Sequence, residues 1–321
     1  MLNLAILDDY HDVALRLADW SVLRHRCAIT VFNRALQVPD EAAEMLGGFD
    51  ILCTMRERMA VPRALIERLP RLRLIAITGD VHRTLDREAA AEHGVTVCHT
   101  QAVTTSTPEL AWGLILALVR NIPLETQAMR LGGWQNTIGR SLAGGTLGLL
   151  GLGRQGAAMA RIGRAFGMRV LAWSPNMTAA LAQEHGAERV EKDRLFRDSD
   201  VVSIHLVLGE RSRGVVGARE IGLMRPTALL INTARGPIVD EAALIDALTH
   251  RRIAGAGLDV FDREPLPDGH ALRRLENALL TPHLGYYTED TIGRFYQQAI
   301  ESIAAFIDGS PIRVLPPPEA T

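Results

Sequence analysis

The sequence predicts an α/β protein with two doubly wound parallel sheets, and three observations lead to this prediction. Short runs rich in Ile, Val and Leu alternate with amphipathic stretches, as in sheets that are covered by helices on both faces. The alternation pauses over a long helix and a Gly-rich stretch, and then starts again. The length of 321 residues is also long for a single hydrophobic core. We therefore expect two domains.

Five apolar runs in the first third of the chain have the length and composition of buried strands. Helical stretches, such as residues 62–68 and 86–93, separate the later runs, which indicates a doubly wound sheet. The expected strands cover residues 4–7, 28–32, 51–54, 74–78 and 95–99. A long helix over residues 107–120 follows, with Ser106 as its N-cap, and links this sheet to the next.

A second set of strands begins after the Gly-rich stretch. It predicts a second sheet of six strands, over residues 147–150, 170–173, 201–205, 228–232, 257–260 and 279–280. The last helix, about residues 289–307, comes after this sheet is complete, and we expect it to return to the first domain. The tail Pro316-Pro317-Pro318 has the composition of a frayed end.

Composition and charge exclude several classes of function. The 35 basic and 37 acidic side chains give a net charge of -2, and no basic run is interleaved with aromatic residues, so we expect no nucleic-acid partner. No apolar run approaches the roughly 20 residues that span a bilayer. The N-terminus has no basic segment and turns acidic where a signal peptide would be apolar, so we expect no signal peptide. We therefore expect a cytoplasmic protein without a membrane partner. Its three cysteines are expected to be reduced core residues, and no His or Cys cluster has the spacing of a metal site.

A dinucleotide fingerprint follows the first strand of the second set. It reads Gly-Leu-Gly-Arg-Gln-Gly and opens a helix that we expect over residues 157–166. Gly151 permits the tight turn, Gly153 lets the backbone approach a pyrophosphate, and Gly156 lets helix and strand pack closely. The helix N-terminus attracts the phosphates. We therefore expect dinucleotide binding, against the alternative of a purely structural glycine turn. The further expected contacts in this run are Arg154 and Gln155.

The next strand, which is expected to carry the ribose contact, ends in Trp-Ser-Pro-Asn. In NAD-binding sheets, an acid about 20 residues after the fingerprint accepts hydrogen bonds from the adenine ribose. Ser174 can bind a ribose hydroxyl but does not repel a 2′-phosphate as a carboxylate does. No adjacent Arg or Lys offers a 2′-phosphate a strong partner. The sequence therefore leaves NAD and NADP open and places NAD ahead.

Polar segments follow three later strands of the second set. They read Asn-Thr-Ala-Arg-Gly, Asp-Val-Phe-Asp-Arg-Glu-Pro and Thr-Pro-His-Leu-Gly. The carboxyl ends of successive parallel strands face the ligand crevice in open α/β sheets. We therefore expect Arg235, Glu264 and His283, which these segments contain, to converge there.

The fingerprint and these three segments, in this order, resemble the D-isomer-specific 2-hydroxyacid dehydrogenases, and the likeness extends from about residue 51 to residue 283. The resemblance implies a Rossmann cofactor domain, residues 102–286, inserted into a flavodoxin-like substrate domain, residues 1–101 with 287–321. It also implies a homodimer. This organisation agrees with the two sets of strands.

By that resemblance, Arg235 holds the substrate carboxylate and carbonyl, His283 exchanges the proton, and Glu264 is the partner of His283. The chemistry of these residue types supports the same roles. A guanidinium is a planar fork of donors that matches a 2-oxo acid, and an imidazole titrates near neutral pH and can protonate a forming alkoxide. The hydride comes from the cofactor. The alternative for Arg235 is a surface ion pair, that for His283 is a hydrogen-bonded core histidine, and that for Glu264 is a solvated loop acid.

Further cofactor contacts are expected around the same strand ends. By resemblance, Asp259 meets the nicotinamide, against the alternative of a turn former. His205 ends its expected strand and lines the crevice, although the family usually has Pro two residues later and this chain has Val207. Thr107 either contacts the nicotinamide or caps its helix. The other expected contacts are Thr233, Ala234 and Gly285.

On the substrate side, Thr-Gly-Asp-Val-His follows an expected strand of the first domain. It matches the place where the family offers backbone groups to the substrate carboxylate, and Gly79 fits that use. Asp80 beside it gives the loop an unusual charge, which leaves the substrate's identity open. Arg56 follows another strand and either reaches the same substrate or is a solvated loop charge.

We therefore expect an oxidoreductase that transfers a hydride between NAD(P)H and a small 2-oxo acid, such as glyoxylate, hydroxypyruvate or a bulkier analogue. One alternative is a phosphoglycerate dehydrogenase without a regulatory domain. Another is a cofactor-binding module that resembles the C-terminal binding proteins, which are transcriptional corepressors with this fold. A formate dehydrogenase is disfavoured, because that branch carries Gln where this chain has Glu264.

Overall fold

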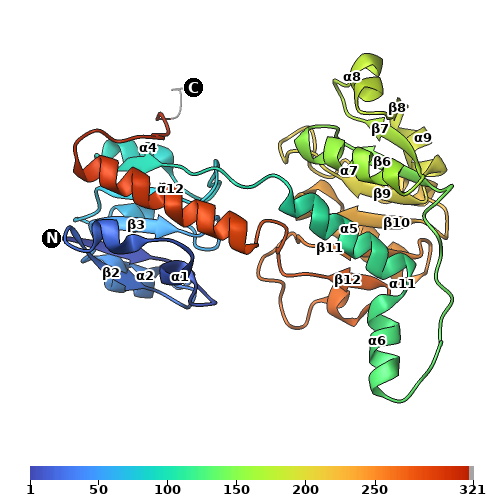
Figure 1. Cartoon of the computed structure of the whole chain (residues 1–321), viewed down its shortest axis with the longest axis horizontal. Coiled ribbons are helices and arrows are strands. Elements are labelled where there is room, and N and C mark those ends of the chain that lie inside the picture. Colours follow the sequence, from blue (N-terminus) through green and yellow to red (C-terminus); the bar gives the residue numbers. More distant parts are fainter. Residues whose placement is uncertain (318–321) are drawn as a thin grey trace. The chain divides into compact units, whose positions relative to one another are not determined.

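The chain folds into two α/β units, each built on one parallel sheet (Figure 1). The computed structural model describes residues 1–317, so Pro318 of the tail lies outside the described residues. The first unit comprises Met1–Val103 and the residues from Thr288 onwards, and the second unit is Thr104–Tyr287. The two-sheet α/β class predicted from the sequence is confirmed.

The first unit has a five-stranded sheet in the order β2-β1-β3-β4-β5, which is the flavodoxin-like order. Its strands are β1 (Leu2–Ile6), β2 (Cys27–Val31), β3 (Ile51–Thr54), β4 (Leu74–Ile77) and β5 (Thr96–Cys98). Every residue of β3 and β4 is buried, which explains their unbroken apolar sequences. The helical segments that cover this sheet are α1 (Ala14–Leu17), η1 (Trp20–Leu23), α2 (Pro39–Leu46), α3 (Arg63–Ile66) and α4 (Arg87–Glu92).

The last helix of the chain, α12 (Glu289–Ile307), has the predicted bounds and returns to the first sheet (Figure 1). Its N-cap Thr288 accepts a hydrogen bond from the backbone N–H of Thr291. The helix packs on α1 and β4. The rings of Trp20 and Tyr296 pack edge to face, with their centroids 5.8 Å apart.

The second unit has a seven-stranded sheet in the order β12-β11-β10-β9-β6-β7-β8, one strand more than the sequence predicted. The additional strand, β8, has only two residues, both exposed, and so shows no apolar run. The strands are β6 (Thr146–Leu150), β7 (Arg169–Trp173), β8 (Glu188–Arg189), β9 (Val201–Ile204), β10 (Leu229–Asn232), β11 (Gly255–Leu258) and β12 (Ala278–Leu280). From β8 to β11 this is the doubly wound dinucleotide-binding order.

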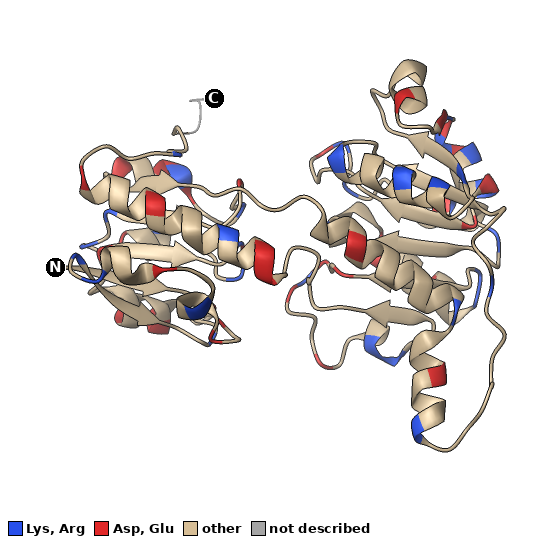
Figure 2. Cartoon of the chain, viewed as in Figure 1, with Lys and Arg blue, Asp and Glu red and all other residues tan. Residues whose placement is uncertain are grey.

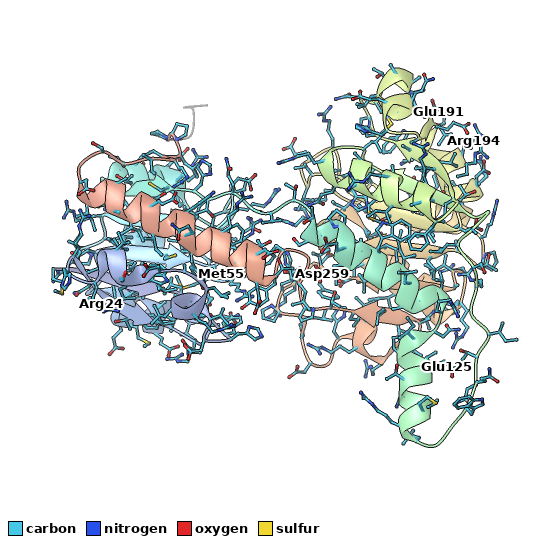
Figure 3. The ribbon with its side chains drawn as sticks, in the orientation of Figure 1. Arg24, Met55, Glu125, Glu191, Arg194 and Asp259 are labelled. Atoms are coloured by element: carbon cyan, nitrogen blue, oxygen red, sulfur yellow. The ribbon has the colours of Figure 1, made fainter. Side chains whose placement is uncertain are left out.

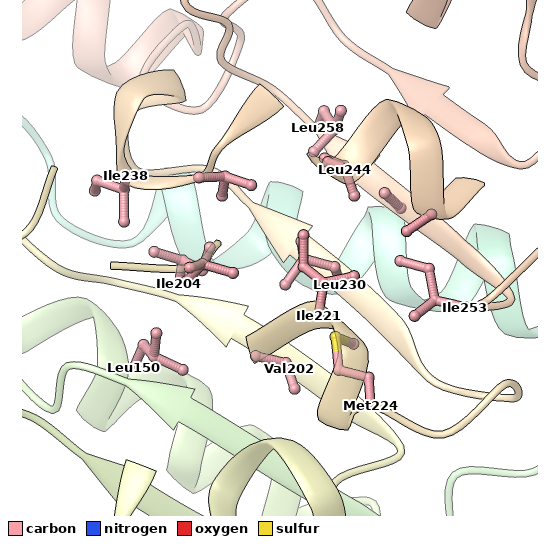
Figure 4. Packing of buried hydrophobic residues seen from close by; sticks show 14 of the residues in the cluster. Leu150, Val202, Ile204, Ile221, Met224, Leu230, Ile238, Leu244, Ile253 and Leu258 are labelled. Atoms are coloured by element: carbon pink, nitrogen blue, oxygen red, sulfur yellow. The ribbon is translucent and has the colours of Figure 1, made fainter. Parts of the chain in front are cut away.

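Helices cover both faces of this second sheet. On one face, α5 (Ser106–Val119) and α7 (Arg154–Ala165) pack on a core that includes Trp112 and Met159. On the other face, α9 (Lys192–Asp198), α10 (Ala218–Leu223) and α11 (Glu241–Thr249) enclose a second core around Leu230 (Figure 4). The remaining helical segments are α6 (Ile122–Arg130), α8 (Ala179–Glu184), η2 (Gly236–Ile238) and η3 (Ala271–Arg274).

The start of α5 differs from the prediction. The N-cap is Thr105, and Ser106 is the first helical residue, with its hydroxyl buried. After α5, helix α6 extends away from the sheet, and all of its residues are half-buried or exposed (Figure 1). We call residues 122–138 the arm.

Basic and acidic residues are interspersed over both units (Figure 2). The three cysteines are buried free thiols, as predicted. Within residues 1–317, no helix combines the length and the apolar character that a membrane span requires.

Candidate active site

The fingerprint forms the turn between β6 and α7, and two of its glycines are required by the backbone itself. Gly151 has a φ of +95°, and a Cβ there would lie 2.6 Å from the carbonyl oxygen of His205. A Cβ on Gly156 would lie 2.1 Å from the carbonyl oxygen of Gly151. A Cβ on Gly153 would stand in open space, so the turn leaves room at that point for a ligand to approach the backbone.

Helix α7 begins three residues earlier than predicted, with Arg154 and Gln155 in its first turn. The first N–H groups of a helix have no partner inside the helix and carry the positive end of its dipole. Arg154 is exposed beside them and adds a positive charge. This end of the helix therefore suits a pyrophosphate.

A pocket of about 570 Å³ lies beyond the carboxyl ends of β7 and β9. Its lining consists of residues 173–176, 206–212 and 215, so it contains Ser174 as well as Asn176 and Arg211. The sequence interpretation placed Ser174 at the ribose but missed the loop that follows β9. The position of this loop in the sheet could have revealed it, because the loop follows β9, the strand that pairs with the fingerprint strand β6.

Two buried polar atoms at neighbouring strand ends have no hydrogen-bond partner within the described residues. They are Nδ1 of His205, after β9, and Oγ1 of Thr233, after β10. Buried polar groups are normally hydrogen-bonded, so these two atoms leave hydrogen-bonding positions that a bound polar group or a water can fill. The Nε2 atom of His205 lies 2.8 Å from the Ser203 hydroxyl, and burial lowers the pKa of His205 to about 4. This imidazole is therefore neutral. Together with the glycine turn and the pocket, these atoms fit a dinucleotide.

Asp259 follows β11 directly (Figure 3). Its side chain is fully buried. The carboxylate accepts hydrogen bonds from Thr281 Oγ1 (2.5 Å), from the Leu284 N–H (2.7 Å) and from the Gly285 N–H (2.8 Å). Burial raises the pKa of Asp259, and these donors oppose the rise. The carboxylate thus holds the loop between β12 and α12. Its expected contact with the nicotinamide stays a prediction.

Thr107 holds the same loop from the other side. Its hydroxyl donates to the carbonyl oxygen of Gly285 at 2.9 Å. A Cβ on Gly285 would lie 3.0 Å from Asp259 Oδ2 and 3.2 Å from Thr107 Cγ2, so this position is crowded from two directions. The hydroxyl of Thr107 therefore fixes the loop and does not cap its helix.

His283 stands in this loop with a φ of +55°. Its Nδ1 atom lies 2.6 Å from Oε2 of Glu264, and the ring of Tyr286 packs edge-on at 5.6 Å. The other oxygen of Glu264 accepts a hydrogen bond from the Phe261 N–H at 2.9 Å. Burial alone would raise the pKa of Glu264, but the hydrogen bond to His283 and nearby positive charge outweigh it, and the pKa lies below its usual value. Glu264 is therefore a carboxylate.

Arg235 lies in a tight turn after β10. The side chain of Asn232 holds this turn, because its Oδ1 accepts from the Ala234 N–H (3.0 Å) and its Nδ2 donates to the Arg235 carbonyl (2.9 Å). A Cβ on Gly236 would lie 2.1 Å from the carbonyl carbon of Phe261, so the turn packs against the segment that leads to Glu264. The charge of Arg235 is close enough to lower the pKa of Glu264. The structure thus brings the Arg, Glu and His together.

The expected substrate residues of the first unit form a cluster of their own. The guanidinium of Arg56 fills the space that a Cβ on Gly79 would need, and Gly79 has a φ of +93°. Arg56 Nη1 lies 4.0 Å from Oδ1 of Asp80, and the Arg56 side chain is only 16% exposed, so it is not a solvated loop charge. The Gly79 N–H donates to Thr100 Oγ1 at 2.7 Å. Because Gly79 has no side chain, the Arg56 guanidinium can pack against its backbone. The expected contacts of Gly79, Asp80 and Arg56 with a substrate stay predictions.

Comparisons with known proteins agree on one family. Residues 112–285 match the NAD binding domain of the D-isomer specific 2-hydroxyacid dehydrogenases. The chain is 40% identical to a glyoxylate reductase of Aeropyrum pernix over 76% of each chain, and 33% identical to a glycerate dehydrogenase of Methylorubrum extorquens over 86% of this chain and 88% of that one. A phosphoglycerate oxidoreductase from Vibrio cholerae has a similar structure, with a TM-score of 0.91, 34% identity and coverage of 96% of this chain and 100% of the other.

The packing of the glycine turn predicts that alanine lowers thermal stability at one helical glycine and not at another. Gly156→Ala should lower the thermal stability of the ligand-free protein, because overpacking against a backbone carbonyl typically costs about 1–3 kcal/mol. Gly113→Ala is the matched control, since its Cβ enters open space in helix α5 and alanine favours the helix. Calorimetry should show a Tm several degrees lower for the first variant only. Equal Tm values would mean that the turn adapts to a side chain.

Proposed function

The chain belongs to the D-isomer-specific 2-hydroxyacid dehydrogenases, and we propose that it reduces a small 2-oxo acid of the glyoxylate or hydroxypyruvate type. Its reaction class is the NAD(P)-dependent interconversion of 2-oxo and 2-hydroxy acids. The names of similar proteins, among them glyoxylate reductase and hydroxypyruvate reductase, support the choice of a small acid. The single observation that carries the proposal is the 2.6 Å contact between His283 and Glu264, with Arg235 beside it.

His283 is the residue that we propose donates and accepts the proton in the reaction. Because Glu264 engages the Nδ1 atom, the ring is oriented and its Nε2 atom is the one that can reach a ligand. Nε2 donates its proton to the carbonyl oxygen of the oxo acid as that oxygen becomes an alkoxide, and it accepts the proton in the reverse direction. The dinucleotide, when bound, supplies or accepts the hydride.

Arg235 is the proposed anchor of the substrate. Its backbone is fixed by Asn232, and a guanidinium presents parallel donors that match a carboxylate and polarise a neighbouring carbonyl. A lysine keeps the charge but loses this fork. For the dinucleotide, we propose Gly151, Gly153 and the start of α7 at the pyrophosphate and Ser174 at the adenine ribose. The proposed contacts nearer the nicotinamide are His205, Thr233, Ala234, Asp259, Gly285 and Thr107.

A binding module without catalysis is not favoured, because the similar proteins are named reductases and dehydrogenases. A cytoplasmic location is supported by the three buried free thiols, since a reducing compartment keeps cysteines unpaired.

We also propose a homodimer, in which the arm of each protomer binds the other. The nine residues of α6 are too few for an isolated helix to be stable in water. None of these nine residues is buried by packing against the rest of the second unit. Closed two-fold dimers are the commonest assemblies of identical chains, and the arm supplies an apolar surface for one. Its exposed apolar residues are Ile122, Leu124, Met129, Leu131, Trp134 and Ile138.

The dimer is tested by sedimentation equilibrium. The wild-type chain should have twice its mass of 35.1 kDa at micromolar concentration. Charge on the arm, as Leu131→Arg with Trp134→Arg, should give a monomer, whereas Val22→Arg, at an exposed apolar residue of the first unit, should leave the dimer intact. A wild-type monomer, or a dimer that survives both arm substitutions, would contradict this proposal.

The catalytic proposal predicts different kinetic effects for two substitutions. His283→Ala should lower kcat with glyoxylate or hydroxypyruvate by about 10²–10⁴-fold, because proton transfer belongs to the chemical step. Arg235→Lys should raise KM for the oxo acid as well as lower kcat. His250→Ala is the control, since His250 also pairs with a carboxylate, Asp246, but on the exposed end of α11. Retention of more than about a tenth of kcat by His283→Ala would refute the acid–base role.

A further inference from the structure

The loop after β9 brings an arginine to the pocket that contains Ser174. Residues 206–212 line this pocket together with the end of β7, and Arg211 is among them. The loop is internally tied, because the hydroxyl of Ser212 donates to the Val207 carbonyl at 2.7 Å and accepts from the Gly209 N–H at 2.8 Å. Arg211 thus comes from an ordered turn, far along the chain from the strand end at which the sequence showed no basic neighbour.

The charges around the pocket leave Arg211 available for a ligand. Within residues 1–317, its guanidinium has no hydrogen-bond or ion-pair partner. Lys192 is engaged, because its ammonium lies 2.8 Å from Glu220 and 3.5 Å from the Val215 carbonyl. Arg213 lies near Asp262, where its charge opposes the rise that burial causes in the pKa of that carboxyl. The lining contains one acid, Glu210, on the same loop.

The end of β7 offers hydrogen bonds without a negative charge. Ser174 and Asn176 stand where NAD-specific sheets keep a carboxylate that would repel a phosphate on the ribose. A hydroxyl, an amide and a guanidinium together form a set of donors suited to a phosphate, and hydrogen bonds from a charged donor to a phosphate are the strong kind. The apolar side chains of Trp173, Leu206 and Leu208 line the same pocket and suit an adenine ring.

We propose that this pocket takes the 2′-phosphate of NADP(H), and that Arg211 is the residue that selects it. The 2′-phosphate lies between the guanidinium of Arg211 and the side chains of Ser174 and Asn176. The inference rests on the proposed function, and it reverses the preference for NAD that the sequence favoured. Arg211 binds the cofactor far from the hydride, so its effect is on dinucleotide affinity.

Two pairs of ligands, whose members differ only in the 2′-phosphate, test the selection. The full-length protein is titrated calorimetrically with adenosine 5′-monophosphate, with adenosine 2′,5′-bisphosphate, and then with NAD⁺ and NADP⁺. Wild-type protein should bind the 2′-phosphorylated member of each pair at least tenfold more tightly. Arg211→Ala should remove that advantage by weakening NADP⁺ at least tenfold while changing the Kd of NAD⁺ less than threefold. Arg213→Ala, on the same loop, should leave both affinities unchanged.

A second substitution approaches the same phosphate from the strand. Ser174→Asp should reverse the preference toward NAD⁺, because a carboxylate binds the ribose hydroxyls and repels the 2′-phosphate. Tighter binding of NAD⁺ than NADP⁺ by the wild type, or equal losses for both dinucleotides in Arg211→Ala, would overturn the inference and leave the proposed function standing. Failure of the wild type to bind either dinucleotide would overturn the proposed function itself.

Discussion

The buried carboxylate of Asp259 fixes the loop that carries His283, and the geometry of the catalytic residues depends on this interaction. A carboxylate removed from water is stabilised only where donors surround it, and here Thr281, Leu284 and Gly285 supply them from one short loop. Thr107 holds the carbonyl of Gly285 from helix α5. The loop is thereby held at both ends around His283, whose φ of +55° lies in the left-handed region that few non-glycine residues adopt.

The seven-stranded sheet then aligns the partners of that histidine. Strands β10, β11 and β12 are neighbours in parallel register, so the segments that follow them begin at the same edge. Asn232 shapes the Arg235 turn, Gly236 lets it pack against Phe261, and the Phe261 N–H orients Glu264 toward His283. Each catalytic side chain is therefore positioned by contacts within and between the segments that follow these neighbouring strands.

The sequence predicts features that depend on local pattern, and misses those that depend on tertiary contacts. Buried parallel strands such as β3 read as apolar runs, and the fingerprint turn needs glycine for backbone reasons alone. The strand β8 has no apolar run, so no periodicity reveals it. Ser106 has the residue type of an N-cap, but the helix begins at it. Arg211 lies in the same pocket as Ser174 because β9 and β7 flank β6 in the sheet. The local sequence around Ser174 does not reveal this order of the strands.

Hydrogen exchange in Asp259→Asn tests the central role of the buried carboxylate most directly. An asparagine has one acceptor oxygen and a donor group in place of the other, so it cannot accept from both sides of the loop. In the ligand-free protein, amides in the peptide 281–287 should exchange at least tenfold faster than in the wild type, while peptides from β9 and β10 stay protected and show that the second unit is folded. Unchanged protection of the 281–287 peptide in the variant would contradict the account, because the loop would then hold its shape without Asp259.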